Sequence, residues 1–297
     1  MKNQTIVVEF IIVGLSNKHH VNIILFAVLS VVFLLTVIGN IIVVTLSLVD
    51  HHLQSTMYFF LRNFSLLEIS FTSVPMQRFL YSLLTERKFI PLPGYFLQLL
   101  GFFLQGTCVF FHVAIMSFDR YVPICRPLSY GTIMNGRVCF QLVLGCWVMS
   151  FLLVFPLTFM VVLLPVCGPN KPLNHFYCDT VPLLQLSCVD TEHIEAMLLV
   201  AAVVVLPGTL TVTIISYGCI ICTIIWIPST RGRKKAFSTC SAHLTVVVIL
   251  YSSAIFRYIR PGQRGTQDFD KVVSLVFCVV AQLFKPYIYA LHNEQVK

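Results

Sequence analysis

The chain has 297 residues, of which 57% are hydrophobic and only 11% are charged, and its net charge is +8. A soluble domain carries about 25% charged residues, so this composition excludes a globule that exposes its whole surface to water. The positive charge does not require nucleic acid, because its strongest local cluster, 231–235, lies in a loop beside a helix end, where lipid or a partner protein is the simpler contact.

The apolar residues form seven long runs, each long enough for the roughly 20 residues that cross a bilayer. The first run, from Ile23 to Leu48, contains a single strongly polar side chain, that of Asn40. A backbone in lipid must satisfy its own polar groups, so each run is expected to be a helix. We therefore expect an all-α membrane protein, a seven-transmembrane helix bundle that forms a single domain over 1–297, with spans at about 23–48, 57–80, 94–119, 138–164, 196–227, 237–259 and 272–291.

The N-terminal segment 1–21 is polar and mixed. It lacks the apolar core and small-residue cleavage site of a signal peptide, so the first span is expected to act as its own signal. Asn3-Gln4-Thr5 is a glycosylation sequon, which is usable only on the outer side of the membrane. Lysine and arginine are otherwise balanced between the two sides of the membrane, so the positive-inside rule by itself does not decide the orientation. The basic cluster 231–235 lies between the fifth and sixth spans, on the side opposite the N-terminus, and it slightly favours its own side as cytoplasmic.

The third span ends on Asp119-Arg120-Tyr121. An arginine at the end of a long apolar helix is costly to place, so it usually has a function. Taken alone, Arg120 is also explained by a side chain that snorkels to the membrane interface. Arg120 alone does not distinguish a functional arginine from a snorkelling one, so further motifs are needed.

Six stretches, read together, resemble the motifs of the odorant receptors, a branch of the rhodopsin-like G-protein-coupled receptors. They occur in the family's order and extend over nearly the whole chain, so together they are a specific signal, although any one alone is weak. The stretches are Gly39-Asn40, Met57-Tyr58-Phe59-Phe60-Leu61, 119–128, Ser216-Tyr217, 234–245 and Pro286-Tyr287-Ile288-Tyr289.

The resemblance implies an extracellular N-terminus, a cytoplasmic C-terminus and a place in the plasma membrane. It implies a small hydrophobic, volatile odorant bound among the third, fifth, sixth and seventh helices. It also implies coupling to the heterotrimeric olfactory stimulatory G protein, which raises cyclic AMP through adenylyl cyclase. We expect no cofactor, no metal and no enzymatic activity, because no metal-ligand spacing, nucleophile constellation or phosphate loop stands out.

The resemblance also assigns residues to G-protein coupling. Asp119 would hold the Arg120 guanidinium at rest by a charge-assisted contact, and Arg120 would be released when the sixth helix moves outward. The polar inner half of the sixth helix would then face the G protein, although helix-end chemistry and hydroxyl hydrogen bonds between helices explain it as well. The expected coupling residues are Asp119, Arg120, Tyr121, Tyr217, Lys234, Lys235, Ser238, Ser241, His243 and Tyr289.

His243 has two interpretations, a pH-sensitive switch or a satisfied structural histidine. The odorant pocket is expected to be apolar, aromatic and small, with Tyr251 as the residue whose movement couples to the ligand. The same side chains would fill any helical core, which is the competing interpretation. The candidate ligand-binding residues are Phe103, Gly106, Thr107, Ala201, Val205, Tyr251, Ile255 and Tyr258.

Three cysteines lie in the loop between the fourth and fifth spans, on the oxidising side. The resemblance implies a Cys167–Cys188 disulfide and a second bond from Cys178 to the top of the third helix, at the position that Tyr95 occupies. Cys108 lies 13 residues further along, about 20 Å down a helix, whereas a disulfide spans about 4.4–6.8 Å between Cα atoms. We therefore expect Cys178 to be an exposed thiol without its partner.

Other positions also depart from the family pattern. Lys285 replaces the family's Asn, and we expect it to form a buried ion pair with Glu68 of the second span or, alternatively, to snorkel toward the cytoplasm. Pro123 is expected to end the third helix about one turn early, beside the coupling motif. Thr56 replaces the family's Pro, and the chain ends at Lys297, before the usual tail.

These departures support a second hypothesis, a degenerate odorant-receptor-like chain that does not signal and is retained in the endoplasmic reticulum. A channel or transporter is poorly supported, because transport usually needs several intramembrane charges or inverted repeats. Here only Glu68 and Lys285 lie deep within the expected spans. The sequence names neither the odorant nor the oligomeric state.

Overall fold

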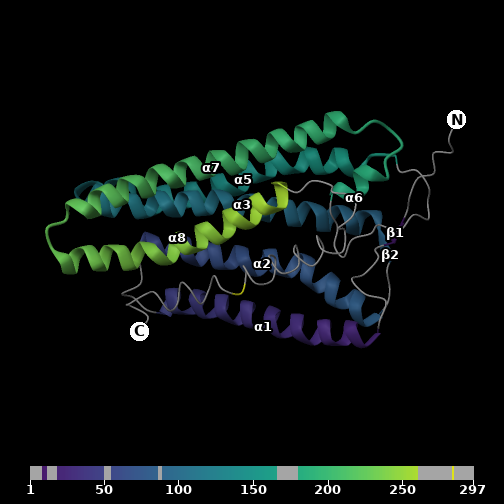
Figure 1. The fold of residues 1–297 in the computed structure, drawn as a ribbon, viewed down its shortest axis with the longest axis horizontal. Coiled ribbons are helices and arrows are strands. Elements are labelled where there is room, and N and C mark those ends of the chain that lie inside the picture. The colour runs from purple at the N-terminus through teal and green to yellow at the C-terminus, as the bar shows by residue number, and fades with distance from the viewer. Residues whose placement is uncertain are drawn as a thin grey trace.

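The computed structural model describes residues 9–11, 19–49, 55–85, 89–165 and 180–259, together with Leu283. Within these ranges the chain forms long helices that lie along one another (Figure 1). The helices and strands are β1 Glu9–Ile11, α1 His19–Val49, α2 Thr56–Thr85, β2 Phe89–Pro91, α3 Leu92–Cys125, η2 Pro127–Ser129, α4 Tyr130–Ile133, α5 Gly136–Val162, α6 Thr180–Gln185, α7 Glu192–Trp226 and α8 Thr230–Ile259.

The long helices α1, α2, α3, α5, α7 and α8 lie over the first six of the expected spans. The seventh, 272–291, falls outside the described residues except for Leu283, which is helical. By length and composition, four helices of the described chain are apolar enough to cross a membrane, at His20–Val49, Leu92–Cys125, Gly136–Val162 and Glu192–Trp226. Helix α2 is more polar because it carries Arg62, Glu68 and Arg78, and in α8 only the shorter stretch Cys240–Ile255 is apolar.

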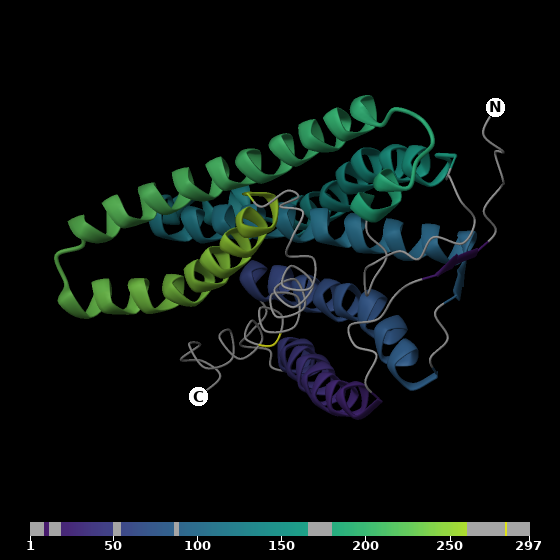
Figure 2. The same ribbon diagram turned by 45° about the vertical axis from the view of Figure 1, so that its right-hand side comes forward.

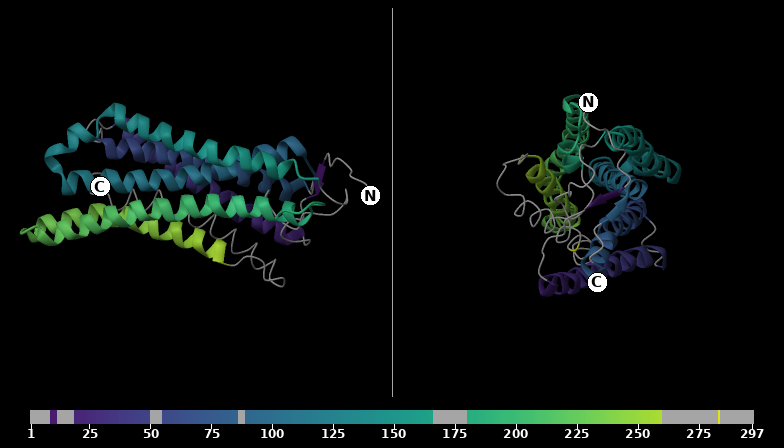
Figure 3. Two further views of the ribbon diagram at one scale, coloured as in Figure 1. Left: turned by 90° about the horizontal axis from the view of Figure 1, so that it is seen from above. Right: turned by 90° about the vertical axis from the view of Figure 1, so that its right-hand side faces the viewer.

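Helix α3 is the centre of the bundle. It packs against α2 on one side and against α5 and α7 on the other, and it also contacts α8. Figure 2 shows α1 at the edge, beyond α2. Seen along its length, the bundle is arranged around α3 rather than as a flat layer (Figure 3). Large apolar side chains of α1, α5 and α7 remain exposed on the outside, as expected of helices whose outer faces meet lipid.

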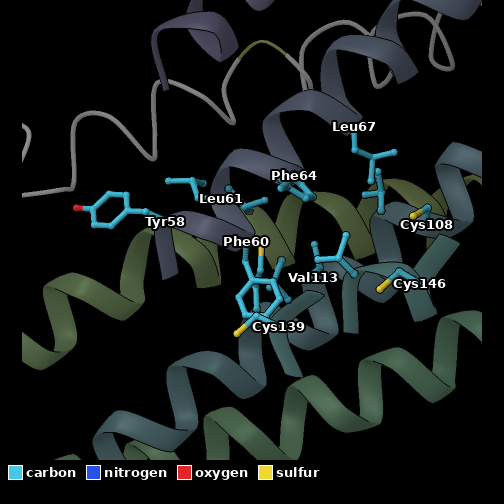
Figure 4. Packing of buried hydrophobic residues seen from close by; sticks show 14 of the residues in the cluster. Tyr58, Phe60, Leu61, Phe64, Leu67, Cys108, Val113, Cys139 and Cys146 are labelled. Carbon is cyan, nitrogen blue, oxygen red and sulfur yellow. The ribbon is translucent and has the colours of Figure 1, made fainter. Parts of the chain in front are cut away.

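The largest core cluster joins α2, α3, α5 and α8, and Val43 of α1 also belongs to it. Figure 4 shows Phe60 of α2 beside Cys139 of α5, with the small side chains of Val113 and Cys146 nearby and Phe64 further along α2. The small residues let the helix backbones approach closely, as membrane helix pairs require. The cluster therefore fixes the inner halves of α2 and α3 against each other, where the coupling motif lies.

Pro123 does not end α3 early, so that expectation was wrong. The helix continues to Cys125, and the Arg126 N–H donates to the Val122 carbonyl over 2.8 Å. A proline removes only its own N–H donor. In the last helical turn that loss leaves a single carbonyl, that of Asp119, without its helical partner, while the residues that follow keep their donors.

A small antiparallel sheet pairs β1 with β2, with Phe10 opposite Ile90. It ties Glu9–Ile11 to the residues that lead directly into α3. We call the end of the bundle that carries this sheet the outer end. The opposite end, where α7 turns into α8 and where η2 and α4 follow α3, is the inner end (Figure 1).

Candidate functional site

Two ionisable side chains are buried at the inner end of α3. Asp119 is 3% exposed and Arg120 is 8% exposed. A charge within an apolar bundle is costly unless it has partners. The partners of both residues come from the first turn of α2.

The Asp119 carboxylate is held by a hydroxyl from α2. The Thr56 Oγ1 hydroxyl donates to Asp119 Oδ1 over 2.8 Å. The same Thr56 oxygen also lies in hydrogen-bond contact with the Tyr130 hydroxyl, from α4. Burial raises the pKa of the Tyr130 phenol above its ordinary value, so this group remains a neutral hydroxyl. The resulting polar cluster joins α2, α3 and α4.

The Arg120 guanidinium contacts the neighbouring residue of α2. Its Nη1 donates toward the Met57 thioether sulfur. The thioether is a weak acceptor, so it holds the arginine loosely compared with a carboxylate. A cation that is enclosed but weakly bound is well suited to change partners.

Helices α7 and α8 are joined at the inner end by a buried hydrogen bond. The Tyr217 hydroxyl and the His243 Nδ1 are 2.6 Å apart, and the two rings stack with centroids 5.9 Å apart. His243 is fully buried, and among the described residues its Nε2 has no hydrogen-bond partner. The histidine therefore has a firm contact on one side only.

Tyr217 also belongs to an apolar cluster that closes this end of the bundle. Ile220 and Ile224 of α7 and Cys240 of α8 complete it, with Tyr121 of α3 packed against them. Outside this cluster, the expected coupling residue Lys234 is exposed and Ser241 is half-buried. The side chains of Lys235 and Ser238 are not described, and Tyr289 lies outside the described residues.

Nearer the middle of the bundle, Tyr251 of α8 is buried against α3 and α7. Its hydroxyl donates to Thr209 Oγ1 of α7 over 2.8 Å, and Thr209 in turn donates to the Val205 carbonyl over 2.6 Å. The Tyr251 ring lies 5.4 Å, centroid to centroid, from that of Phe110 in α3. The structure thus brings together two of the expected ligand-binding residues, Val205 and Tyr251.

Thr209 and Phe110 were not singled out from the sequence. Each lies one helical turn beyond a candidate residue, after Val205 and Gly106 respectively, and helix geometry places residues four apart on one face. A hydroxyl on the apolar helix α7 is the signal that could have identified Thr209, although Thr211 and Thr213 carry one as well.

The other candidate ligand-binding residues are more dispersed. Phe103, Thr107 and Ala201 are half-buried, whereas Ile255 is 42% exposed. Gly106 faces α2, because a Cβ added there would lie 3.5 Å from the Phe71 ring. The side chain of Tyr258 is not described.

At the outer end, Cys188 is disulfide-bonded, and its partner lies outside the described residues. The Cys188 N–H donates to the Pro165 carbonyl over 2.8 Å, which places it beside the chain two residues before Cys167. Cys108 is a free, buried cysteine. Cys167, Cys178 and the Asn3 sequon lie outside the described residues.

Tyr95, in the place of the expected cysteine, is only 1% exposed. It packs with Leu99 of the same helix and with Val161 and Leu183 from α5 and α6. A large ring therefore fills this position and contributes to the outer-end core. Glu68 is completely buried in α2, and its expected partner Lys285 lies outside the described residues.

Comparison with known proteins gives a consistent result. A family model described as olfactory receptor matches residues 29–297. The chain is 47% identical to mouse olfactory receptor 6E1 over 298 aligned positions, which cover 100% of this chain and 95% of the relative. It is 48% identical to human olfactory receptor 6C75, with 95% of that relative covered, and 44% identical to human olfactory receptor 2AP1, with 96% covered; in both cases the whole chain aligns.

Proposed function

This chain belongs to the olfactory receptor family, and from that premise we propose that it binds a small hydrophobic odorant within the helix bundle and activates the olfactory stimulatory G protein, raising cyclic AMP. The family consists of odorant receptors rather than enzymes, with seven transmembrane helices in the plasma membrane. The identity of the G protein and the cyclic AMP response belong to the proposal.

One observation supports this mechanism above the others: two hydrogen bonds join the same pair of helices, α7 and α8, at two depths. Thr209 and Tyr251 form the upper bond and Tyr217 and His243 form the lower one. The two bonds are eight residues apart on each helix, about 12 Å at 1.5 Å per residue. The same spacing on both helices means that the two bonds fix the position of α8 along α7 together. A movement of α8 that breaks one bond therefore also strains the other.

In the proposed mechanism, an odorant lodges beside Tyr251, among Phe103, Gly106, Thr107, Ala201, Val205, Ile255 and Tyr258. Contact with the Tyr251 ring moves α8 outward, which breaks the bond to Thr209 and then the bond between Tyr217 and His243. Arg120 leaves the weak Met57 acceptor. The opened inner end, with Tyr121, Lys234, Lys235, Ser238, Ser241 and Tyr289, then receives the G protein.

We expect Tyr251→Phe to raise odorant-independent cyclic AMP about fivefold. The change removes one buried hydrogen bond, with a net value of about 1 kcal/mol, while it keeps the ring. Thr209→Val removes the same bond from α7 and should have the same effect, and the double variant should add nothing further. The measurement is cyclic AMP per receptor at the cell surface.

A matched control is Tyr81→Phe, because Tyr81 is an exposed tyrosine of α2. It should leave cyclic AMP unchanged. Additive effects of Tyr251→Phe and Thr209→Val would show that the two residues do not act through one bond.

The second candidate function, a retained and silent receptor-like chain, is favoured by Tyr95 in the place of a disulfide cysteine. The loss of that disulfide does not leave the position without a stabilising contact, because the buried Tyr95 ring packs between α3, α5 and α6. Cys178 remains the proposed unpaired thiol, which labelling of intact cells with a membrane-impermeant thiol reagent would detect.

For Tyr95, we expect Tyr95→Ala to lower the amount of receptor at the cell surface several-fold. Truncating a large buried aromatic ring costs about 3–5 kcal/mol. Tyr95→Cys should also reach the cell surface in a smaller amount than the natural chain. A disulfide with Cys178 would add about 2–5 kcal/mol of stability, but the cavity left by the missing ring offsets that gain. If Tyr95→Cys instead reaches the surface better than the natural chain and gains a signal, the silent-chain hypothesis is correct.

A further inference from the structure

The first residue of α2 contacts both the coupling motif and the loop that follows it. Tyr58 N–H and Phe59 N–H both donate to the Ser55 carbonyl, over 3.0 and 3.2 Å, so Thr56 stands at the first helical position. Proline, which the family resemblance places here, suits that position well but carries no hydroxyl. Threonine keeps the helix start and adds one hydroxyl at the inner end of the bundle.

The direction of the hydrogen bonds follows from counting protons. A threonine hydroxyl has a single proton, and Thr56 donates it to Asp119 Oδ1 over 2.8 Å. The contact between Thr56 and Tyr130 must therefore be donated by the Tyr130 phenol. Tyr130, Thr56 and Asp119 form one chain of hydrogen bonds that ends on a carboxylate, where such bonds are strongest. We call these three residues the Thr56 clasp.

The loop held by this clasp has little structure of its own. After α3 ends, Arg126 and the three residues of η2 are exposed, and Leu128 is fully exposed. Helix α4 has only four residues, far fewer than the roughly 12 that an isolated helix needs. Its position must come from tertiary contacts, which are the packing of Tyr130 and Met134 on the core and the hydrogen bond to Thr56.

The clasp contacts the coupling motif at one oxygen of the Asp119 carboxylate. Arg120, the next residue of the motif, lies against Met57, the next residue of α2. The first turn of α2 therefore contacts both ionisable residues of the motif, and the clasp links them to the loop.

We propose that Thr56 is a positioning residue for coupling: its hydroxyl holds the loop that contains α4 against Asp119 of the coupling motif. This inference rests on the proposed coupling to a G protein. It assigns to this chain a contact that a receptor with proline at this position does not have. Loss of the hydroxyl weakens coupling because the loop loosens.

The test compares Thr56→Val, which keeps the shape and removes the hydroxyl, with Thr56→Ser, which keeps the hydroxyl. Tyr130→Phe removes the other end of the clasp. We expect Thr56→Val and Tyr130→Phe each to lower odorant-independent cyclic AMP per surface receptor about fivefold, as for one buried hydrogen bond. The double variant should lose no more than either single variant, and Thr56→Ser should retain the signal.

A second readout, independent of signalling, is hydrogen exchange of 126–134 in the purified full-length receptor. Exchange there should rise in Thr56→Val and Tyr130→Phe but not in Thr56→Ser. Thr85→Val is the matched control, because Thr85 lies at the opposite end of α2, where its hydroxyl donates to the Tyr81 carbonyl of the same helix. It should change neither cyclic AMP nor hydrogen exchange.

The outcomes separate the two proposals. Equal exchange and equal cyclic AMP in Thr56→Val and Thr56→Ser would overturn the role of Thr56. If exchange rises as expected while the natural chain, present at the surface, produces no cyclic AMP, the clasp is real and the coupling to the stimulatory G protein is wrong. If cyclic AMP falls in Thr56→Val without any change in exchange, the ordering of the loop is wrong.

Discussion

Replacement of Arg120 by Ala is expected to reduce cyclic AMP to the level of cells without the receptor, a loss of about tenfold or more, with the receptor still at the cell surface. Arg120 is nearly buried, but its contact is the weak acceptor of Met57. The fold therefore loses little when the side chain is truncated. In the proposed mechanism, a bound G protein by contrast loses the cation of the coupling motif.

The matched control for this change is Arg62→Ala. Arg62 also lies in the inner half of the bundle, on α2, with its guanidinium 5.6 Å from the Phe59 ring centroid. We expect that variant to keep most of the signal, because its loss is a surface cation–π contact of about 0.5–1 kcal/mol. Surface amounts, measured with an extracellular tag, allow the two arginine variants to be compared per receptor. Full signalling by Arg120→Ala would remove Arg120 from the coupling mechanism.

Lys285→Ala is expected to lower the surface amount of the receptor at least tenfold, because we propose that Lys285 pairs with the buried carboxylate of Glu68 and the change would remove that cation. Glu68 is 0% exposed, and removal of one partner of a buried ion pair costs about 3–5 kcal/mol. The double change Glu68→Gln with Lys285→Asn replaces both charges with neutral polar groups and should restore the surface amount. The proposed ion pair should also make signalling insensitive to sodium.

Comparison of these two variants is the decisive part of that experiment. The proposed pair predicts a large difference between Lys285→Ala and the double variant. If both variants behave alike, Glu68 and Lys285 do not interact. Lys234→Ala, at an exposed lysine of α8, serves as the control for the loss of a positive charge.

The helices of the described chain follow from the sequence because long apolar runs leave the backbone no alternative in lipid. The start of α2 lies next to the predicted residue 57, whereas the extent of α3, which continues to Cys125, was less predictable. The effect of Pro123 was overestimated, because a proline in the last turn disrupts one hydrogen bond rather than a whole helix. The pairing of β1 with β2 could not be predicted either, since strands of three residues are too short to show an alternating pattern.

The candidate site was predictable as a set of residues but not as a set of contacts. Tyr217, His243 and Tyr251 were expected from the family motifs, yet their bonds join residues 26 and 42 positions apart in the chain. Thr56 was visible as a departure from the family, but its partners are 63 and 74 residues away. No local pattern identifies such partners, because packing of the helices brings them together.

Tyr95 illustrates the same limit for a substitution. From the sequence it marks the absence of a disulfide, which suggests a damaged receptor. In the structure the ring is part of a buried cluster shared by α3, α5 and α6. The position is therefore filled by a different stabilising contact, and its cost or benefit depends on neighbours that only the fold reveals.

The most direct test of receptor activity is cyclic AMP measured against an odorant panel in cells that contain the olfactory stimulatory G protein and the extracellularly tagged chain. Our account predicts surface receptor with cyclic AMP above that of Arg120→Ala at equal surface amount, and a dose-dependent rise with at least one hydrophobic odorant. A chain that reaches the surface but matches Arg120→Ala without odorant, and responds to none, would contradict the proposed coupling.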